Sequence, residues 1–246
     1  MKDEKKHFQA SESNLTIALL TMSGGLQDAY TYINRGGVLA NAQTGNIVRM
    51  SQHILDGDAH GFLRFLAPVL AFGTGVFIAE EIHTHVERRA KERAHLNEER
   101  QKRLHWRQLV VLVEVVLLLA TAFIPHSLDF LANILVSFSC AMQVQTFRKV
   151  HGLAYASTMC IGNLRSCFEA LHMFRTTREL EFLVKTGEYL FMITIFGIGA
   201  ALGIVLSRIY DAYGILLSCL LLLASFVTMF PPRTANAAAA GQRRRE

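Results

Sequence analysis

The chain has 246 residues, of which 51% are apolar and 18% are charged, and its formal net charge is +5. Soluble domains carry about 25% charged residues, so this composition argues against a soluble domain and favours a membrane protein. A helix that crosses a bilayer needs about 20 apolar residues, so the apolar half of the chain is enough for roughly six crossings. The cysteines have neither disulfide-framework nor zinc-site spacing, which excludes a secreted disulfide scaffold and predicts reduced packing residues at Cys140, Cys160, Cys167 and Cys219.

The N-terminal region has the charge pattern of a signal peptide but no suitable cleavage site. Three lysines precede an apolar stretch at 15–22, whereas the small-residue triplet at 40–42 lies too far downstream for a signal peptidase. We therefore expect an uncleaved first span at 15–34.

Further apolar runs of spanning length follow along the chain, together with two segments that are more polar. The runs are 62–83, 109–125, 128–147, 184–207 and 213–230. The more polar segments, 40–57 and 153–174, have helical patterns, but each carries an internal arginine and several amides or hydroxyls.

The distribution of basic residues predicts which side of the membrane each loop faces. Lys and Arg accumulate in cytoplasmic loops. Residues 84–107 hold eight of them against four glutamates, and both ends of the chain are basic, so we expect all three regions to be cytoplasmic. An even number of crossings must separate them, which makes 40–57 and 153–174 re-entrant. The sequence therefore predicts an all-α polytopic membrane protein with six spans and both termini in the cytoplasm.

The two halves of the chain resemble each other weakly. The alignment pairs Gly25 with Ala141, Gln27 with Gln143 and, after one inserted residue, Gly45-Asn46 with Gly162-Asn163. The first spans of the halves cross in opposite directions, which gives the inverted topology of many secondary transporters and some channels. The predicted organisation is a cytoplasmic tail at 1–14, a first membrane repeat at 15–125 with a cytoplasmic basic loop at 84–107, a second repeat at 128–230 and a disordered cytoplasmic tail at 231–246.

One run of residues in the first repeat resembles a known family. It consists of Gly25, Asp28-Ala29, Gly36-Gly37, Asn41 and Thr44-Gly45-Asn46, and it is similar to the YoaK family of small bacterial membrane proteins, grouped under a domain of unknown function. The resemblance covers nearly the whole chain, although Leu39 stands where an aromatic residue is commoner in that family. It implies a polytopic protein of the bacterial inner membrane and no established reaction.

Asp28 is the first candidate functional residue, because it lies inside the first predicted span. A carboxylate at that depth is costly unless it is paired, hydrated or protonated, so it should face the bundle interior or a wet cavity. Two interpretations stay open. Asp28 is either a structural carboxylate satisfied by neighbours such as Gln27 and Thr31, or a carboxylate linked to protons or substrate.

The glycine pair 36–37 breaks the chain, and residues that favour helix starts follow it. A helix that begins near Thr44 would direct free amide groups into the protein, where an anion or a polar solute could bind. Arg49 and Arg165 strengthen the anionic option. Alternatively, the amides and hydroxyls only satisfy the broken backbone. The complete predicted substrate-binding set is Asp28, Gln27, Asn41, Thr44, Gly45, Asn46, Arg49, Gln143, Gly162, Asn163 and Arg165.

Other polar and small residues fit structural roles. Glu114 and Glu188 lie near the cytoplasmic starts of their predicted spans and fit interfacial or interhelix pairing better than a role as relay groups. The pair His83 and His85 has no third ligand at helical spacing, so we expect no metal and no cofactor. Gly199-x-x-x-Gly203 predicts close helix packing.

The predicted function is passage of a small polar or anionic solute, with proton coupling as an option. Familiar enzyme signatures are missing, and the basic loop lacks the aromatic residues of a nucleic-acid site. The expected partners are the lipid bilayer and the solute, without nucleic acid, and homo-oligomerisation stays open. The alternative is a membrane protein that does not transport, either a scaffold or regulator or an enzyme for a lipid-soluble substrate.

Overall fold

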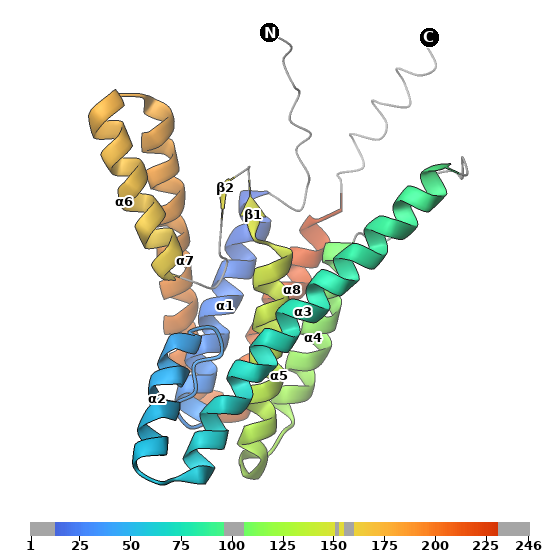
Figure 1. Cartoon of the computed structure of the whole chain (residues 1–246), viewed down its shortest axis with the longest axis vertical. Helices are drawn as coiled ribbons and strands as arrows, with labels where there is room; N and C mark the ends of the chain where they lie inside the picture. Colours follow the sequence, from blue (N-terminus) through green and yellow to red (C-terminus); the bar gives the residue numbers. More distant parts are fainter. Residues whose placement is uncertain (1–12, 96–105, 151–152, 155–159, 231–246) are drawn as a thin grey trace.

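The computed structural model describes residues 13–95, 106–150, 153–154 and 160–230 (Figure 1). Its α-helices are α1 (Asn14–Asn34), α2 (Gln43–Leu55), α3 (Ala59–His95), α4 (Trp106–Ala122), α5 (Asp129–Thr146), α6 (Cys160–Thr177), α7 (Leu180–Tyr210) and α8 (Leu216–Thr228). Single 3-10 turns, η2 (His126–Leu128) and η3 (Asp211–Ile215), precede α5 and α8. The antiparallel pair β1 (Lys149–Val150) and β2 (Leu153–Ala154) follows α5.

The predicted helical fold is confirmed, because a helix lies at each of the apolar runs and at both of the more polar segments. The small β1–β2 pair is the exception. Within the described residues, three segments are long and apolar enough to cross a membrane: 59–89, 126–146 and 180–228. The third contains η3, where the chain reverses between α7 and α8 (Figure 1). The tails predicted at 1–14 and 231–246 lie outside the described residues almost entirely, as does part of the basic loop.

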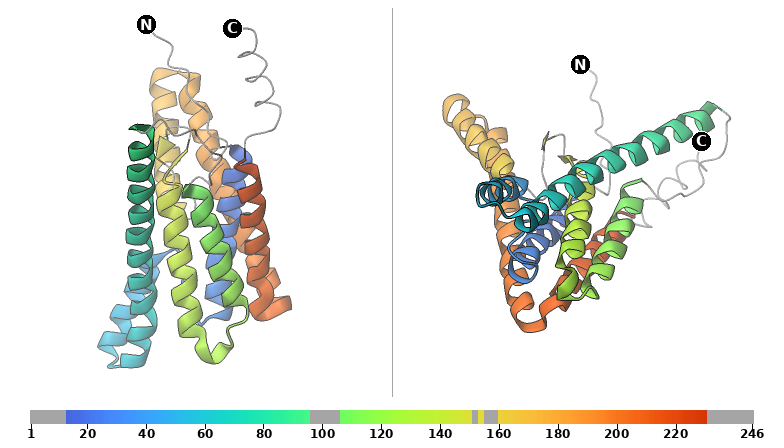
Figure 2. Two further views of the ribbon diagram at one scale, coloured as in Figure 1. Left: turned by 90° about the vertical axis from the view of Figure 1, so that its right-hand side faces the viewer. Right: turned by 60° about the horizontal axis from the view of Figure 1, so that its bottom comes forward.

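The helices alternate in direction along the long axis of the molecule (Figure 1). Helices α1, α4 and α7 run downward in that view, and α3, α5 and α8 run upward. The two more polar helices, α2 and α6, lie toward opposite ends of the bundle, α2 toward the lower end and α6 toward the upper end. The side view separates the same helices and places the α6–α7 hairpin above the neighbouring helices (Figure 2).

The two halves of the chain, α1–α4 and α5–α8, pack on each other through equivalent pairs of helices. Helix α1 packs against α7 and α8, whereas α5 packs against α3 and α4. Helix α2 packs against α3, the next helix in the chain, and α6 packs in the same way against α7. Each half of the chain therefore depends on the other half for much of its buried surface.

Glycines allow the closest helix crossings. A Cβ atom at Gly199 or Gly203 would collide with α1 at the Met22 and Leu26 carbonyls, so the predicted close packing at this small-residue stripe is confirmed. On the other side of the bundle, a Cβ at Gly75 of α3 would lie 2.6 Å from the Phe138 carbonyl oxygen of α5. Met22 and Phe138 are each three residues before the aligned Gly25 and Ala141, so the two crossings use equivalent positions.

The core of the bundle joins apolar residues from both halves. Leu20 and Leu26 of α1, Val136 of α5 and Leu222 of α8 are fully buried in one cluster. Many large apolar side chains on the outside are exposed, among them Phe77, Val116, Phe168, Val184 and Leu220. This distribution is typical of a helical bundle whose outer surface contacts lipid.

Candidate functional site

The first candidate element is the non-helical segment that connects α1 to α2. Gly36 and Gly37 have φ values of +77° and +76°, which side chains with a Cβ rarely adopt, and they end the helical path of α1. The chain then turns back along α1 and enters α2 at Gln43. The predicted break and the predicted helix start are therefore found where the sequence placed them.

Asp28 holds this returning segment against α1. Its Oδ1 atom accepts a hydrogen bond of 2.8 Å from the Asn41 backbone amide, and the amides of Ala40 and Ala42 face the same carboxylate. The Asn41 side chain donates to the Gly24 carbonyl at 3.1 Å. Asp28 is 8% exposed, so this carboxylate is buried with its partners. The Asp28 carboxylate thus accepts hydrogen bonds from the backbone amides that precede α2.

The Asn46 side chain forms hydrogen bonds with residues close to it in the chain. Its Nδ2 atom donates to the Leu39 carbonyl at 2.7 Å and to Gln43 Oε1 at 2.9 Å, while its Oδ1 accepts from the Leu39 amide. The residue before α2, Ala42, forms no side-chain cap, and Thr44 is exposed. For Asn46, these bonds match the alternative in which the amide satisfies a broken backbone.

Gln27 lies in a buried polar cluster that joins three helices. Its Nε2 atom donates to Ser23 Oγ at 2.9 Å and to Ser218 Oγ of α8 at 3.1 Å, and the two serine hydroxyls hydrogen-bond to each other. The Cys140 thiol of α5 donates to Gln27 Oε1 at 2.9 Å. The aligned residue Gln143 donates to the Leu20 carbonyl of α1 at 2.9 Å. The two aligned glutamines therefore both lie at interfaces between the halves.

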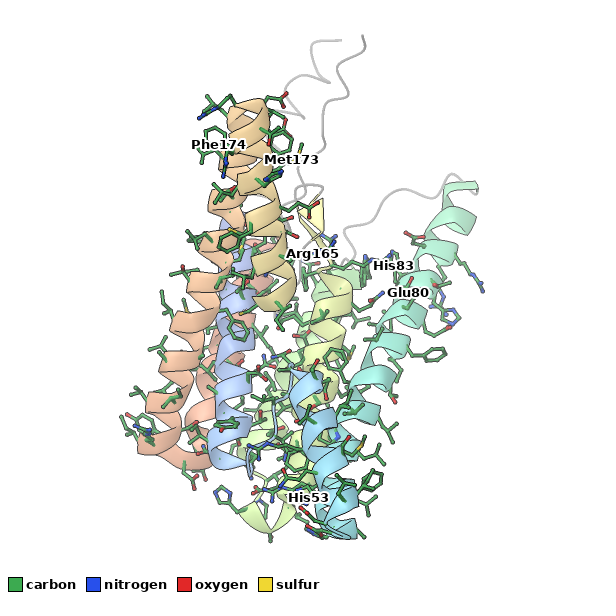
Figure 3. All side chains as sticks on the ribbon, turned by 60° about the vertical axis from the view of Figure 1, so that its left-hand side comes forward. His53, Glu80, His83, Arg165, Met173 and Phe174 are labelled. Atoms are coloured by element: carbon green, nitrogen blue, oxygen red, sulfur yellow. The ribbon has the colours of Figure 1, made fainter. Side chains whose placement is uncertain are left out.

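The second-half candidates lie at the start of α6. Asn163 is buried, whereas Arg165 and Gly162 are exposed, and a Cβ built at Gly162 would meet no described atom outside its own turn of helix within 4 Å. Arg165 lies on the lower part of α6, above α2 (Figure 3). Helices α2 and α6 each pack on the helix that follows. Equivalent positions of inverted repeats lie around a pseudo-two-fold axis, so the aligned residues Asn46 and Asn163 are predicted to approach each other near the membrane centre.

A basic cluster surrounds the glycine turn at the lower end of the bundle. The Arg64 guanidinium fills the space that a side chain at Gly36 would need, and Arg49 Nη1 lies 3.3 Å from the Cβ position of Gly37. The Arg49 guanidinium also lies 5.6 Å from the centroid of the Phe65 ring. Among the described residues, neither arginine has a carboxylate within ion-pair distance. We call Arg49 and Arg64 the arginine pair.

His53 and Asp58 close the α2–α3 turn beside the arginine pair. His53, at the lower end of α2 (Figure 3), stacks on Phe65 with ring centroids 5.5 Å apart, and its Nδ1 lies 3.0 Å from Asp58 Oδ2. The Gly61 amide donates to Asp58 at 3.0 Å and, with His53, holds the pKa of that carboxyl below its usual value. Asp58 therefore stays ionised and caps the start of α3.

Arg35 is a buried residue that the sequence did not single out. Its side chain is fully buried and donates to Asp129 Oδ1 at 2.7 Å, to the Tyr30 hydroxyl at 2.9 Å and to the carbonyls of Thr121 and Ile124. It connects the end of α1 to the turn between α4 and α5. The only sequence signal for this contact is an acidic residue, Asp129, in an otherwise apolar region.

Glu114 was expected at a cytoplasmic boundary, and the structure corrects that expectation. It is the ninth of the 17 residues of α4 and is fully buried, so it lies at the middle of the helix. Among the described residues, neither of its carboxylate oxygens has a hydrogen-bond partner. The helix begins at Trp106, three residues before the predicted apolar run, and this earlier start moves Glu114 deeper into the bundle.

The paired histidines near the other end of α3 take part in local contacts. His83 Nε2 lies 3.0 Å from Glu87, and the His83 ring lies 4.5 Å from Trp106 (Figure 3). Glu80 accepts a hydrogen bond from Gln145. The described residues contain no group of three His, Cys, Asp or Glu side chains with the geometry to hold a metal ion.

Comparisons with known proteins identify the family of this chain. No curated protein and no solved structure matches the chain significantly. No named homologue supports the YoaK assignment, which stays a prediction. A family model matches residues 16–228, from the first turn of α1 to the last residue of α8, and the chain therefore belongs to the family described as protein of unknown function, DUF1275.

Proposed function

We propose that this chain is a multi-pass protein of the bacterial inner membrane with six spans in two inverted repeats. The spans would be α1, α3, α4, α5, α7 and α8, with α2 and α6 as re-entrant helices from opposite faces. The exchanged packing of α1 on α7 and of α5 on α3 supports this arrangement, as do the matching glycine crossings. The basic residues of 84–107 favour a cytoplasmic location for the end of the bundle that carries α6.

We further propose that the protein moves a small polar or anionic solute across the membrane. The observation that carries this proposal is the pair of polar helices, which are directed to opposite ends of one bundle, each after a break in the helical path, at 35–42 before α2 and at β1–β2 before α6. Non-helical backbone at membrane depth is tolerated where it lies within protein or lines a water-filled path. A passive scaffold has no need of two such breaks, whereas alternating access between inverted repeats uses them.

The arginine pair favours an anionic solute. Arg49 and Arg64 place two guanidinium groups beside one glycine turn, and no described carboxylate neutralises them. Guanidinium groups bind carboxylate and phosphate through paired hydrogen bonds. At the outward end of the bundle they would raise the local concentration of anions and orient an anion for entry.

Solute flux in proteoliposomes tests this proposal. Candidate solutes are first found by thermal-shift screening of the purified protein, and their uptake is then measured with and without the Arg64→Gln substitution. Loss of one charge-assisted hydrogen bond, about 1.5–3 kcal/mol, should raise the KM for an anion by roughly tenfold or more and leave a neutral solute unaffected. Arg208→Gln, at an exposed position of α7, is the matched control.

Two outcomes contradict the proposal. If the wild-type protein moves none of the screened solutes, the transport proposal is wrong and the scaffold and enzyme alternatives are favoured. An equal loss of affinity for anionic and neutral solutes would show that Arg64 shapes the fold of the entrance and does not select charge.

A further inference from the structure

Glu114 is the most unusual buried charge-bearing group in the bundle. It lies eight residues from each end of α4, about 12 Å at 1.5 Å per residue, and none of its surface is exposed. In the part of the chain that the structure describes, both carboxylate oxygens are without hydrogen-bond partners. Buried polar groups in folded proteins almost always have partners, so the exception needs a reason.

The groups around Glu114 come from the helices that pack on α4. From α5, the Cys140 thiol lies within electrostatic reach of both Glu114 and Asp28. From α8, the Cys219 thiol is directed to the Val115 carbonyl, next to Glu114 in sequence. The charged groups that the structure shows at α4 lie toward its ends, because Arg107 is its second residue and Arg35 of α1 donates to the carbonyls of Thr121, in its last turn, and of Ile124. The described residues thus provide Glu114 with no cationic partner.

Cys140 connects Glu114 to the polar cluster of the first repeat. The thiol donates to Gln27, which donates in turn to Ser23 and Ser218. Asp28, the residue after Gln27, is already engaged by the amides of the returning segment. Of the two carboxyl groups near Cys140, Glu114 is therefore the one whose oxygens are free to bind.

A carboxylate without a partner in an apolar interior is stable only as the neutral acid or with a bound cation. The described residues contain no group of three or more His, Cys, Asp or Glu side chains that could hold a metal ion, whereas a hard cation requires several oxygen ligands. A proton satisfies the carboxylate without further ligands. Protonation of Glu114 is therefore favoured over binding of a metal cation.

We propose that Glu114 is the proton-binding residue of the membrane bundle: its carboxylate takes up one proton to form the carboxylic acid and releases that proton to solvent during the functional cycle. The proposal rests on the proposed transport function and assigns its proton coupling to Glu114, while Asp28 keeps the structural role of holding the segment before α2.

Infrared spectroscopy of the purified wild-type protein tests proton binding independently of transport. A protonated carboxylic acid has a distinct C=O band, which shifts when the proton exchanges with deuterium. We expect such a band, its downshift in D₂O, and its loss in Glu114→Gln with retention in Glu188→Gln on α7. Labelling the wild-type chain with ¹³C-carboxyl glutamate assigns the band to glutamate, and not to Asp28, if the Gln variant does not fold.

The infrared outcomes are decisive in both directions. A glutamate band that is lost in Glu114→Gln and exchanges in D₂O supports the proposal. Absence of any glutamic acid band would mean that Glu114 is ionised, and a band that persists unshifted in D₂O would mean that its proton is permanently enclosed. Either result overturns the proposal.

Flux measurements then separate this proposal from the proposed function. Solute uptake by the wild type should accelerate when a pH gradient is imposed, and Glu114→Gln should lose that acceleration while it retains solute exchange without a gradient. Acceleration that survives in Glu114→Gln overturns the coupling role. Absence of flux in the wild type would instead overturn transport, and an exchangeable Glu114 proton would still establish the binding site.

Discussion

The Asp28 carboxylate of α1 accepts a 2.8 Å hydrogen bond from the backbone amide of Asn41, thirteen residues along the chain. This bond joins α1, in its C-terminal half, to the non-helical segment that returns beside it. Helix α2 has no side-chain cap of its own, and the Asp28 carboxylate instead accepts hydrogen bonds from the amides just before it. The position of α2 therefore depends on a residue of α1.

Replacement of Asp28 should destabilise the protein in proportion to the acceptors that are lost. Asp28→Ala leaves buried amides without partners, which costs about 1–3 kcal/mol for each unsatisfied group. Asp28→Asn keeps one acceptor oxygen and should fall between Ala and the wild type. Thermal unfolding in detergent measures the order, with Thr44→Ala as the control in the same segment.

The same variants separate the two interpretations of Asp28 in function. A structural role predicts that Asp28→Asn keeps its activity, whereas a proton-linked role predicts that Asn and Ala both lose pH-dependent flux. Normal pH-dependent flux in a folded Asp28→Asn variant would rule out the second interpretation.

The glycine crossing of α1 and α7 should tolerate no side chain. A Cβ at Gly199 meets the Met22 carbonyl, so Gly199→Ala must separate the helices at a cost of about 1–3 kcal/mol. Gly197→Ala is the matched control two residues away, where the added Cβ would lie within 4 Å of no other described helix. We expect a lower unfolding temperature only for Gly199→Ala, and equal values for both variants would contradict the crossing.

Arg35 should be essential for stability. Arg35→Ala removes the donor to the Tyr30 hydroxyl and to the Ile124 carbonyl, one of two donors to the Thr121 carbonyl, and the arginine partner of Asp129, which then keeps only His126 among the described residues. Losses of this kind cost about 3–5 kcal/mol. Arg35→Lys should restore only part of the loss, because an ammonium group cannot reach the same set of acceptors in a planar fork. The unfolding temperature in detergent is the measurement, with Arg208→Ala as an exposed control. An unchanged value for Arg35→Ala would contradict the buried arrangement.

Membrane sidedness can be tested with reporter fusions. Lys102, which lies outside the described residues, is predicted in the cytoplasm, and Gly57, in the turn between α2 and α3, is predicted on the opposite side. Fusions at the two positions should therefore report opposite compartments. If both report the same compartment, the re-entrant assignment of α2 and the inverted repeat fail together.

Local sequence features were sufficient for the elements and their order. Apolar runs of spanning length predict helices without any knowledge of tertiary contacts. Gly36-Gly37 interrupts a helix through backbone geometry alone. The close packing at Gly199 and Gly203 was predictable as well, because the spacing of two small residues on one helix face is a local property. The family resemblance also rested on one continuous run of residues.

The roles of the buried polar residues could be decided only by the tertiary structure. Asn46 fits a ligand-binding amide in sequence, yet its bonds to Leu39 and Gln43 depend on how the chain folds back after α1. Arg35 is indistinguishable from a boundary arginine until the α4–α5 turn, some ninety residues later, surrounds it. Glu114 likewise becomes a buried acid without a partner only because α5 and α8 cover α4. Burial and hydrogen bonding are properties of neighbours distant in sequence, so apolar periodicity along one helix could place these residues in a span but could not predict what each of them contacts.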